Sequence, residues 1–401
     1  DGNIYTLPVF LMYNDGNSER MFVKQPWLEE LGLENPDTLD DFVNVLHAFK
    51  AAYPDSYPLG GGALGDDPRS YVLNAFGFLV SNENDAGYGM ALREGEAVIP
   101  GGTAVYRDYL DLMRGLYEDG ILSPSFFTTD ATTANALVAE NKAGYFPSYP
   151  YKAVPEIEKF QQWTSAKPLT SQWNSTKQWL YPTRVNIGGI AVSSATDHAE
   201  TICRFLDFFF SEVGGLYTWN GPMNGNADCL DMTQGWIINE NGDFIYPDVQ
   251  EGKYSSNLER NYNTTMGFHS SFGNRAGSAA HPEWNQTNVM QWLYGAEVVK
   301  PAWDMTNGDR HFRSSMEVEI SPYEVTGYPA IVYFDEKTTI RMSDLSSVIN
   351  AYIETETAKF ITGIRDLGEF DKYLEELNSL GFEEYLVYYK GAYADYLKAM
   401  N

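Results

Sequence analysis

Residues 1–9 read Asp-Gly-Asn-Ile-Tyr-Thr-Leu-Pro-Val, and residues 21–33 read Met-Phe-Val-Lys-Gln-Pro-Trp-Leu-Glu-Glu-Leu-Gly-Leu. In the first stretch a polar turn leads into an apolar strand, which we predict over Asn3–Met12. In the second, a proline begins a short helix over Pro26–Leu33, which Gly32 ends. Strands and helices alternate in this way through the first two thirds of the chain, and this alternation predicts an α/β fold.

Hydrophobic spacing and capping residues predict the other elements. Thr38 is expected to cap a helix whose first turn is rich in aspartate. Further helices are predicted over Ser70–Phe78, Thr103–Gly120, Thr128–Asn141, Thr196–Gly214, Ser343–Thr362 and Glu369–Ala399. Strands are predicted over Lys142–Phe146 and Ile187–Ser193, with a hairpin over Trp236–Ile245 that turns at Asn241-Gly242.

Length and composition favour two folded lobes and exclude several functions. A chain of 401 residues is too long for one ordinary core. No apolar run of about 18 residues occurs, so no membrane-spanning helix is predicted. The net charge of −28 argues against nucleic acid as a partner, because binding it requires clustered lysine and arginine. The five histidines are scattered without metal-ligand spacing, so we predict neither a metal nor another cofactor.

The two cysteines leave two interpretations open. Cys203 falls within a predicted helix, and Cys229 lies in the polar loop that follows it. One interpretation is a buried small residue and a separate loop thiol, and the other is a disulfide between them.

Aromatic residues are unusually frequent. They make up 15% of the chain, with 28 tyrosines and 9 tryptophans, and many stand beside glycine, asparagine or proline. Aromatic rings with polar ends suit a sugar, because its C–H face stacks on a ring while its hydroxyls meet polar side chains. The alternative is that a tyrosine-rich composition carries no functional meaning.

Four blocks, in order, carry a resemblance to a known family. They are residues 1–33, Ala134–Phe146, Gly188–Gly215 and Ala358–Leu386. Together they resemble the extracellular solute-binding proteins of ABC importers, in the large-lipoprotein branch that includes carbohydrate binders. The resemblance implies a two-lobed, periplasmic-binding-protein-like α/β fold with hinge-linked lobes and a helical C-terminus. It places residues 1–14 and 186–315 in the N-terminal lobe and residues 15–185 and 316–401 in the C-terminal lobe.

This resemblance implies a function without catalysis. The chain is expected to capture a carbohydrate, in particular an oligosaccharide, and to deliver it as a monomer to membrane permease subunits of an ABC importer. Family members carry about a hundred further residues before the first block, including a signal and a lipidated cysteine. We therefore expect an incomplete N-terminal lobe, an opening strand Ile4–Val9 that needs partner strands from outside this sequence, and a cell-surface location through a lipid anchor. A calcium loop of relatives is not expected, because Asp55 alone cannot supply about six oxygen ligands.

Ligand contacts in a two-lobed binder come from strand ends and loops of both lobes. Glycine-rich loops, proline-stiffened aromatic segments and tryptophans among polar neighbours are the candidates here. The predicted ligand-binding residues are Phe10, Tyr13, Asp66, Asp67, Arg69, Tyr149, Tyr151, Trp173, Trp219, Asn220 and Trp284. The alternatives are a solvated, helix-capping turn for the loop 60–69 and packing between helices for the tyrosines.

Rival functions remain open at this point. Aromatic and acidic residues also occur in glycoside hydrolases, which hold two carboxyl groups about 5 to 9 Å apart, although no hydrolase motif is present. The same fold also serves peptide binders, which need charged partners for peptide termini. A cell-surface scaffold without a small ligand is a third, weaker possibility.

Overall fold

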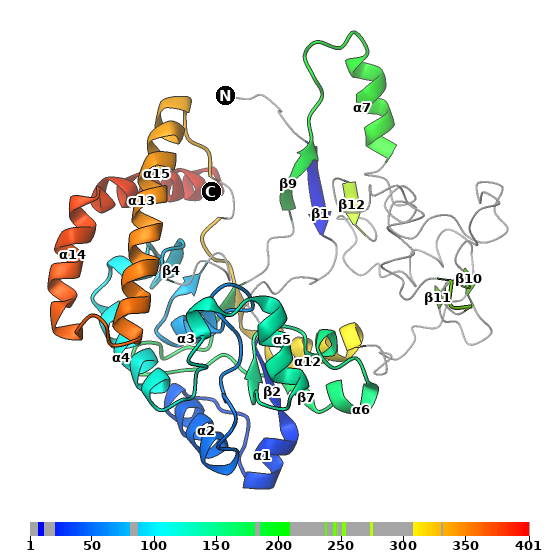
Figure 1. Cartoon of the computed structure of the whole chain (residues 1–401). Helices are drawn as coiled ribbons and strands as arrows, with labels where there is room; N and C mark the ends of the chain where they lie inside the picture. The colour runs from blue at the N-terminus through cyan, green and yellow to red at the C-terminus, as the bar shows by residue number, and fades with distance from the viewer. Residues whose placement is uncertain are drawn as a thin grey trace. The chain divides into compact units, whose positions relative to one another are not determined.

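A computed structural model describes residues 7–11, 21–80, 87–180, 185–208, 237–238, 244–245, 247, 251–253, 273–275, 308–329 and 332–400. The chain divides into two compact units (Figure 1). Unit 1 consists of Asp1–Gly16 and Pro182–Ala302, and unit 2 of Asn17–Tyr181 and Trp303–Asn401. Each unit is built from segments that are distant in the sequence, so neither is a continuous stretch of chain.

Unit 1 contains a sheet with the opening strand in its middle. Strand β1 (Leu7–Leu11) pairs antiparallel with β9 (Val185–Ile190) and parallel with β12 (Gly273–Arg275). The expectation that this strand needs partners from outside the sequence is therefore wrong, since strands of the same chain border it on both sides. The partners lie more than 170 residues away, and strand pairing over such a distance leaves no local sequence signal.

Helix α7 (Ala199–Asp207) follows β9 in unit 1, where a helix was predicted. Its Cys203 is exposed, so the interpretation of Cys203 as a buried residue is wrong. Cys229, the other half of the possible disulfide, lies outside the described residues. Strands β10 (Ile237–Ile238) and β11 (Phe244–Ile245) pair antiparallel and confirm the predicted hairpin.

Unit 2 contains most of the described helices. They are α1 (Gln25–Leu31), α2 (Leu39–Ala52), α3 (Arg69–Ala75), α4 (Val105–Glu118), α5 (Ala131–Ala139), α6 (Ile157–Phe160), α12 (Gly308–Glu319), α13 (Glu336–Ile361), α14 (Phe370–Ser379) and α15 (Phe382–Met400). No helix in the described part of the chain is both long enough and apolar enough to cross a membrane.

Three small sheets accompany these helices in unit 2. Their strand orders are β6-β2-β7, β3-β4-β5 and β13-β8. The strands are β2 (Phe22–Lys24), β3 (Leu79–Val80), β4 (Ala91–Arg93), β5 (Glu96–Val98), β6 (Tyr145–Phe146), β7 (Trp163–Ser165), β8 (Trp179–Leu180) and β13 (Glu324–Val325). In the first sheet, β2 pairs antiparallel with both neighbours.

The amphipathic helices of unit 2 follow the predicted spacing. Thr38 caps α2, and its hydroxyl accepts a hydrogen bond from the backbone N–H of Asp41 at 3.1 Å. The apolar face of α4 is buried, and its Tyr106 and Tyr109 side chains are fully shielded from solvent. The exposed side of α4 carries aspartates, so the helix separates a packed face from a charged one.

The C-terminal segment packs back onto α4, because α13 contacts both α4 and α15 (Figure 1). The segment Glu369–Ala399 is helical, as predicted, and it forms two separate helices, α14 and α15. The break falls at Leu380-Gly381, where Gly381 has a φ of +94°. A side chain at this glycine would also meet the Leu345 side chain at 2.7 Å. The backbone therefore turns where only glycine fits easily.

Candidate functional site

The predicted ligand loop 60–69 is held tightly by its own backbone. Gly62 donates to the carbonyl of Asp66 at 3.2 Å, and Gly65 donates to the carbonyl of Gly62 at 3.2 Å. A Cβ atom at Gly62 would lie 2.4 Å from the backbone oxygen of Thr129. The loop is thus packed against the segment that precedes α5, and its shape depends on glycine.

Asp67 and Arg69 form a buried ion pair at the start of α3. The Arg69 Nη2 and Nε atoms lie 2.6 and 2.8 Å from Asp67 Oδ2, and each side chain is at most 3% exposed. Burial alone would lower the pKa of Arg69, but the Asp67 carboxylate outweighs it, and the pKa is raised. The Asp67 carboxylate and the Arg69 guanidinium thus pair with each other inside the loop. A ligand contact by either residue stays a prediction.

Asp66 differs from its neighbour. Its side chain is half-buried, its φ is +56°, and it accepts a weak hydrogen bond of 3.4 Å from Asn135 Nδ2 on α5. Aspartate tolerates this left-handed conformation better than most residues. Of the three charged residues predicted in the loop, Asp66 is therefore the one that is not buried.

Tyr149 and Tyr151 belong to an aromatic cluster, which we define as Phe22, Tyr149, Tyr151, Phe160 and Phe312. Tyr149 is 5% exposed, and its ring centroid lies 5.6 Å from that of Phe22 and 5.5 Å from that of Tyr151. Tyr151 is half-buried and stacks on Phe312 at 6.1 Å. The tyrosines were predicted, whereas Phe312 on α12 was not. No local signal identifies Phe312, because its partners are more than 150 residues away.

Trp173 lies elsewhere in unit 2, in a loop beside α4. Its indole stacks on Phe76 with ring centroids 4.4 Å apart, and its Nε1 donates to Asp108 Oδ2 at 3.1 Å. Among the described residues, no ring contact links Trp173 to the aromatic cluster. The structure therefore does not bring Trp173 together with the other predicted aromatic residues of unit 2.

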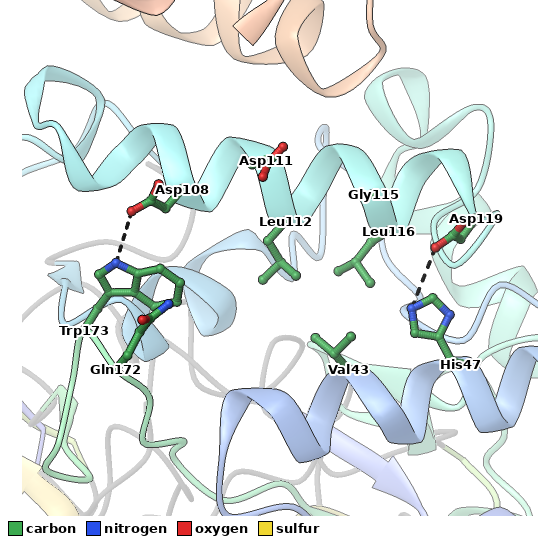
Figure 2. A pocket seen from close by; sticks show the side chains of 10 residues that line it. All are labelled: Val43, His47, Asp108, Asp111, Leu112, Gly115, Leu116, Asp119, Gln172 and Trp173. Atoms are coloured by element: carbon green, nitrogen blue, oxygen red, sulfur yellow. Dashed lines mark hydrogen bonds and ion pairs between the residues drawn. The ribbon is translucent and has the colours of Figure 1, made fainter.

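Trp173 closes one end of a groove of about 500 Å³ (Figure 2). Helices α2 and α4 form its walls, and we call it the α2–α4 groove. Its apolar side chains are Val43, Leu112, Leu116 and Trp173. Its polar side chains are His47, Asp108, Asp111, Asp119 and Gln172. The only sequence feature that indicates this groove is the spacing of Asp108, Leu112 and Asp119 along one face of α4. The same spacing is also typical of an ordinary solvent-exposed helix face.

The other predicted site residues lie outside what the structure describes. Only the backbone of Phe10 is described, within β1, and Tyr13, Trp219, Asn220 and Trp284 fall outside the described ranges. Within those ranges, no group of three histidine, cysteine, aspartate or glutamate side chains is arranged to hold a metal.

The fold class is that of the two-lobed periplasmic binding proteins, as the sequence predicted. Residues 6–215 match the bacterial extracellular solute-binding protein family, and the chain belongs to this family. The family resemblance inferred from the four sequence blocks is thereby confirmed.

Two curated relatives and one solved structure are similar to the chain. The lipoprotein LipO of Bacillus subtilis is 30% identical over 60% of this chain and 50% of its own length. The fructooligosaccharide ABC transporter substrate-binding protein FusA of Streptococcus pneumoniae is 26% identical over the whole chain and 71% of FusA. The structure of FusA in complex with kestose superposes with a TM-score of 0.68 at 18% identity, covering all of this chain and 77% of that one. The chain thus spans half the length of LipO.

Proposed function

We propose that this chain captures an oligosaccharide for an ABC importer and catalyses no reaction. The observation that carries the proposal is the similarity to FusA, which extends over the whole chain and not over a single motif. FusA is named as a fructooligosaccharide ABC transporter substrate-binding protein, and one of its solved structures is a complex with kestose. Permease subunits are the proposed partners, and the proposed place of action is the cell surface, through a lipid anchor and as a monomer.

The described part of the chain supports a sugar as the ligand. Tyr151 presents a half-buried ring that Phe312 backs, so an aromatic surface is held rigidly at little further entropic cost. Asp66 offers a partly exposed carboxylate, which accepts hydrogen bonds from hydroxyl groups. We assign unit 1 to the N-terminal lobe and unit 2 to the C-terminal lobe of the family.

Isothermal titration calorimetry against kestose, nystose, sucrose, maltotriose and trialanine tests the proposal. We expect at least one oligosaccharide to bind and the peptide not to bind. Substitution Tyr151→Ala is expected to weaken sugar binding by about 1 kcal/mol, which is roughly fivefold in Kd. Tyr333→Ala is the matched control, because the Tyr333 side chain is 81% exposed and lies outside the aromatic cluster.

Two results would contradict the proposal. Binding of trialanine without any sugar would favour the peptide-binding alternative. Release of reducing ends during prolonged incubation of the protein with the bound sugar would show a glycoside hydrolase.

Equal affinities of Tyr151→Ala and Tyr333→Ala for the sugar would remove Tyr151 from the site but leave the proposal of sugar capture intact. The same comparison applied to Trp173→Ala, Tyr149→Ala and Trp219→Ala tests the remaining predicted aromatic residues.

A further inference from the structure

Strand β7 has an outer edge that no strand of its sheet covers. In the described part of unit 2, β7 is the last strand of the sheet β6-β2-β7. On the side of β2, the carbonyl of Gln162 accepts a hydrogen bond from the backbone N–H of Gln25 at 2.8 Å. Successive residues of a strand direct their backbone groups to opposite edges, so the carbonyl of Trp163 and the N–H of Ser165 point away from β2.

Two side chains of α12 bind these outward groups, and Figure 1 shows α12 beside β7. His311 Nε2 lies 2.8 Å from the carbonyl oxygen of Trp163, and because a carbonyl only accepts, Nε2 carries the proton and donates. The backbone N–H of Ser165 donates to Ser315 Oγ at 2.7 Å. Four residues of helix rise by about 6 Å, and two residues of strand by about 6.6 Å. The two spacings match, so α12 is held on β7 in one register.

The hydrogen bond of His311 joins two distant parts of unit 2. Helix α12 belongs to the segment Trp303–Asn401, whereas β7 belongs to the segment Asn17–Tyr181. His311 is 9% exposed and Trp163 is 2% exposed, so water does not readily replace the bond. Loss of the imidazole would leave a buried carbonyl without this donor, which is unfavourable.

The residue after His311 is Phe312, which contacts every other member of the aromatic cluster. Phe312 is fully buried, and its ring centroid lies 4.6 Å from that of Phe22. The ring planes of Phe312 and Tyr151 differ by 25°, so the two rings lie nearly parallel. Because His311 and Phe312 are neighbours on one helix, the hydrogen bond that holds α12 on β7 also holds the ring that backs Tyr151.

We infer that His311 is a positioning residue for ligand capture. It acts through Phe312, which keeps the Tyr151 ring in place for stacking, and not by touching the sugar. A ring that is ordered before binding loses less entropy when the ligand arrives. The inference rests on the proposed function, in which Tyr151 contacts the sugar.

Titration calorimetry with kestose tests the inference. His311→Leu removes the donor and should raise the Kd for kestose about threefold, which is part of the roughly fivefold effect assigned to Tyr151. His311→Gln keeps an amide N–H donor and should restore the Kd to within about twofold of the unmodified chain. In the Tyr151→Ala background, His311→Leu should change the Kd by less than about 1.5-fold, because the ring that it positions is gone.

The matched control is Thr357→Val. Its hydroxyl lies 2.8 Å from that of Tyr106, in a buried contact between α13 and α4 outside the aromatic cluster. Loss of this buried hydrogen bond should lower the melting temperature, as His311→Leu does, but leave the Kd for kestose unchanged. Equal Kd values for His311→Leu and Thr357→Val would overturn the inference. An equal effect of His311→Leu with and without Tyr151 would overturn it as well.

Hydrogen exchange measured by mass spectrometry gives a test that needs no sugar. Tyr151 lies in the 3₁₀ turn η3 (Pro150–Lys152), where the backbone N–H of Lys152 donates to the carbonyl of Tyr149 at 3.1 Å. His311→Leu should speed exchange in α12 and in η3, and Thr357→Val in neither. Unchanged exchange in η3 would overturn the inference even if kestose binds. If no sugar binds, the proposed function fails, and exchange in η3 still shows whether His311 orders the segment of Tyr151.

Discussion

Replacement of Asp67 by alanine should strongly destabilise unit 2. In the folded chain, the Asp67 carboxylate accepts hydrogen bonds from Arg69 Nε at 2.8 and 3.0 Å and from the Arg69 backbone N–H at 2.9 Å. The Arg69 guanidinium is also within 5.8 Å of the ring centroids of Phe126 and Phe127. Loss of the carboxylate would leave the guanidinium buried among apolar groups without a counter-charge.

The magnitude follows from this burial. Removal of one partner from a buried ion pair costs about 3–5 kcal/mol, because the remaining charge stays out of water. That is a large share of the roughly 5–15 kcal/mol by which a typical protein is stable. The double variant Asp67→Leu/Arg69→Met, in which no charge remains, should recover much of the loss.

Urea unfolding followed by tryptophan fluorescence measures these differences. The matched control is Asp395→Ala, which breaks an ion pair with Lys398 whose side chains are 76% and 78% exposed. Breaking this exposed pair should not change the free energy of unfolding measurably. If Asp67→Ala costs no more than Asp395→Ala, or if the double variant is as unstable as Asp67→Ala, the buried pair does not hold the loop as described.

Three further predictions concern local features of unit 2. Thr38→Ala should lower the free energy of unfolding by about 1 kcal/mol through loss of the α2 cap, and an unchanged urea midpoint would contradict this role. Gly115→Ala should raise the free energy of unfolding by about 0.5–1 kcal/mol, because no heavy atom lies within 4 Å of the added Cβ on α4. A lower urea midpoint for this variant would show that the added methyl group clashes with its surroundings. Hydrogen bonds from Tyr352 and from Arg365 lower the pKa of Glu376. The stability that this lowered pKa contributes should be present above the ordinary glutamate pKa and should disappear as the pH falls below it. The variant Glu376→Gln should therefore show a urea midpoint that depends less on pH between roughly pH 3 and pH 6. A pH dependence equal to that of the unmodified chain would refute the linkage.

Local features were the most predictable part of the fold. The cap at Thr38, the buried face of α4 and the hairpin pairing of β10 with β11 all follow from residues close in sequence. Spacing of apolar residues reports burial of one helix face directly, since side chains three and four positions apart share that face. The sequence predicted a helical segment here but not the break at Gly381, because a helical pattern continues on both sides of it.

The candidate site was predicted less completely than the fold. The polar loop 60–69 was identified, but its charged pair, Asp67 and Arg69, turned out to be buried. Charge alone does not reveal whether a side chain meets solvent or a partner two residues away. Phe312 joins Tyr151 only through tertiary packing, and composition could suggest an aromatic site without naming its members.

By itself, the sequence determined the α/β class, the family and the position of several helices, because these depend on local spacing and on motifs in order. Only the tertiary structure decided the partners of the opening strand, the burial of the Asp67–Arg69 pair and the α2–α4 groove. Each of these joins segments that approach only when the chain folds, so no spacing rule along the chain encodes it. The four sequence blocks together thus indicated the family, while β9 and β12 complete the sheet around β1.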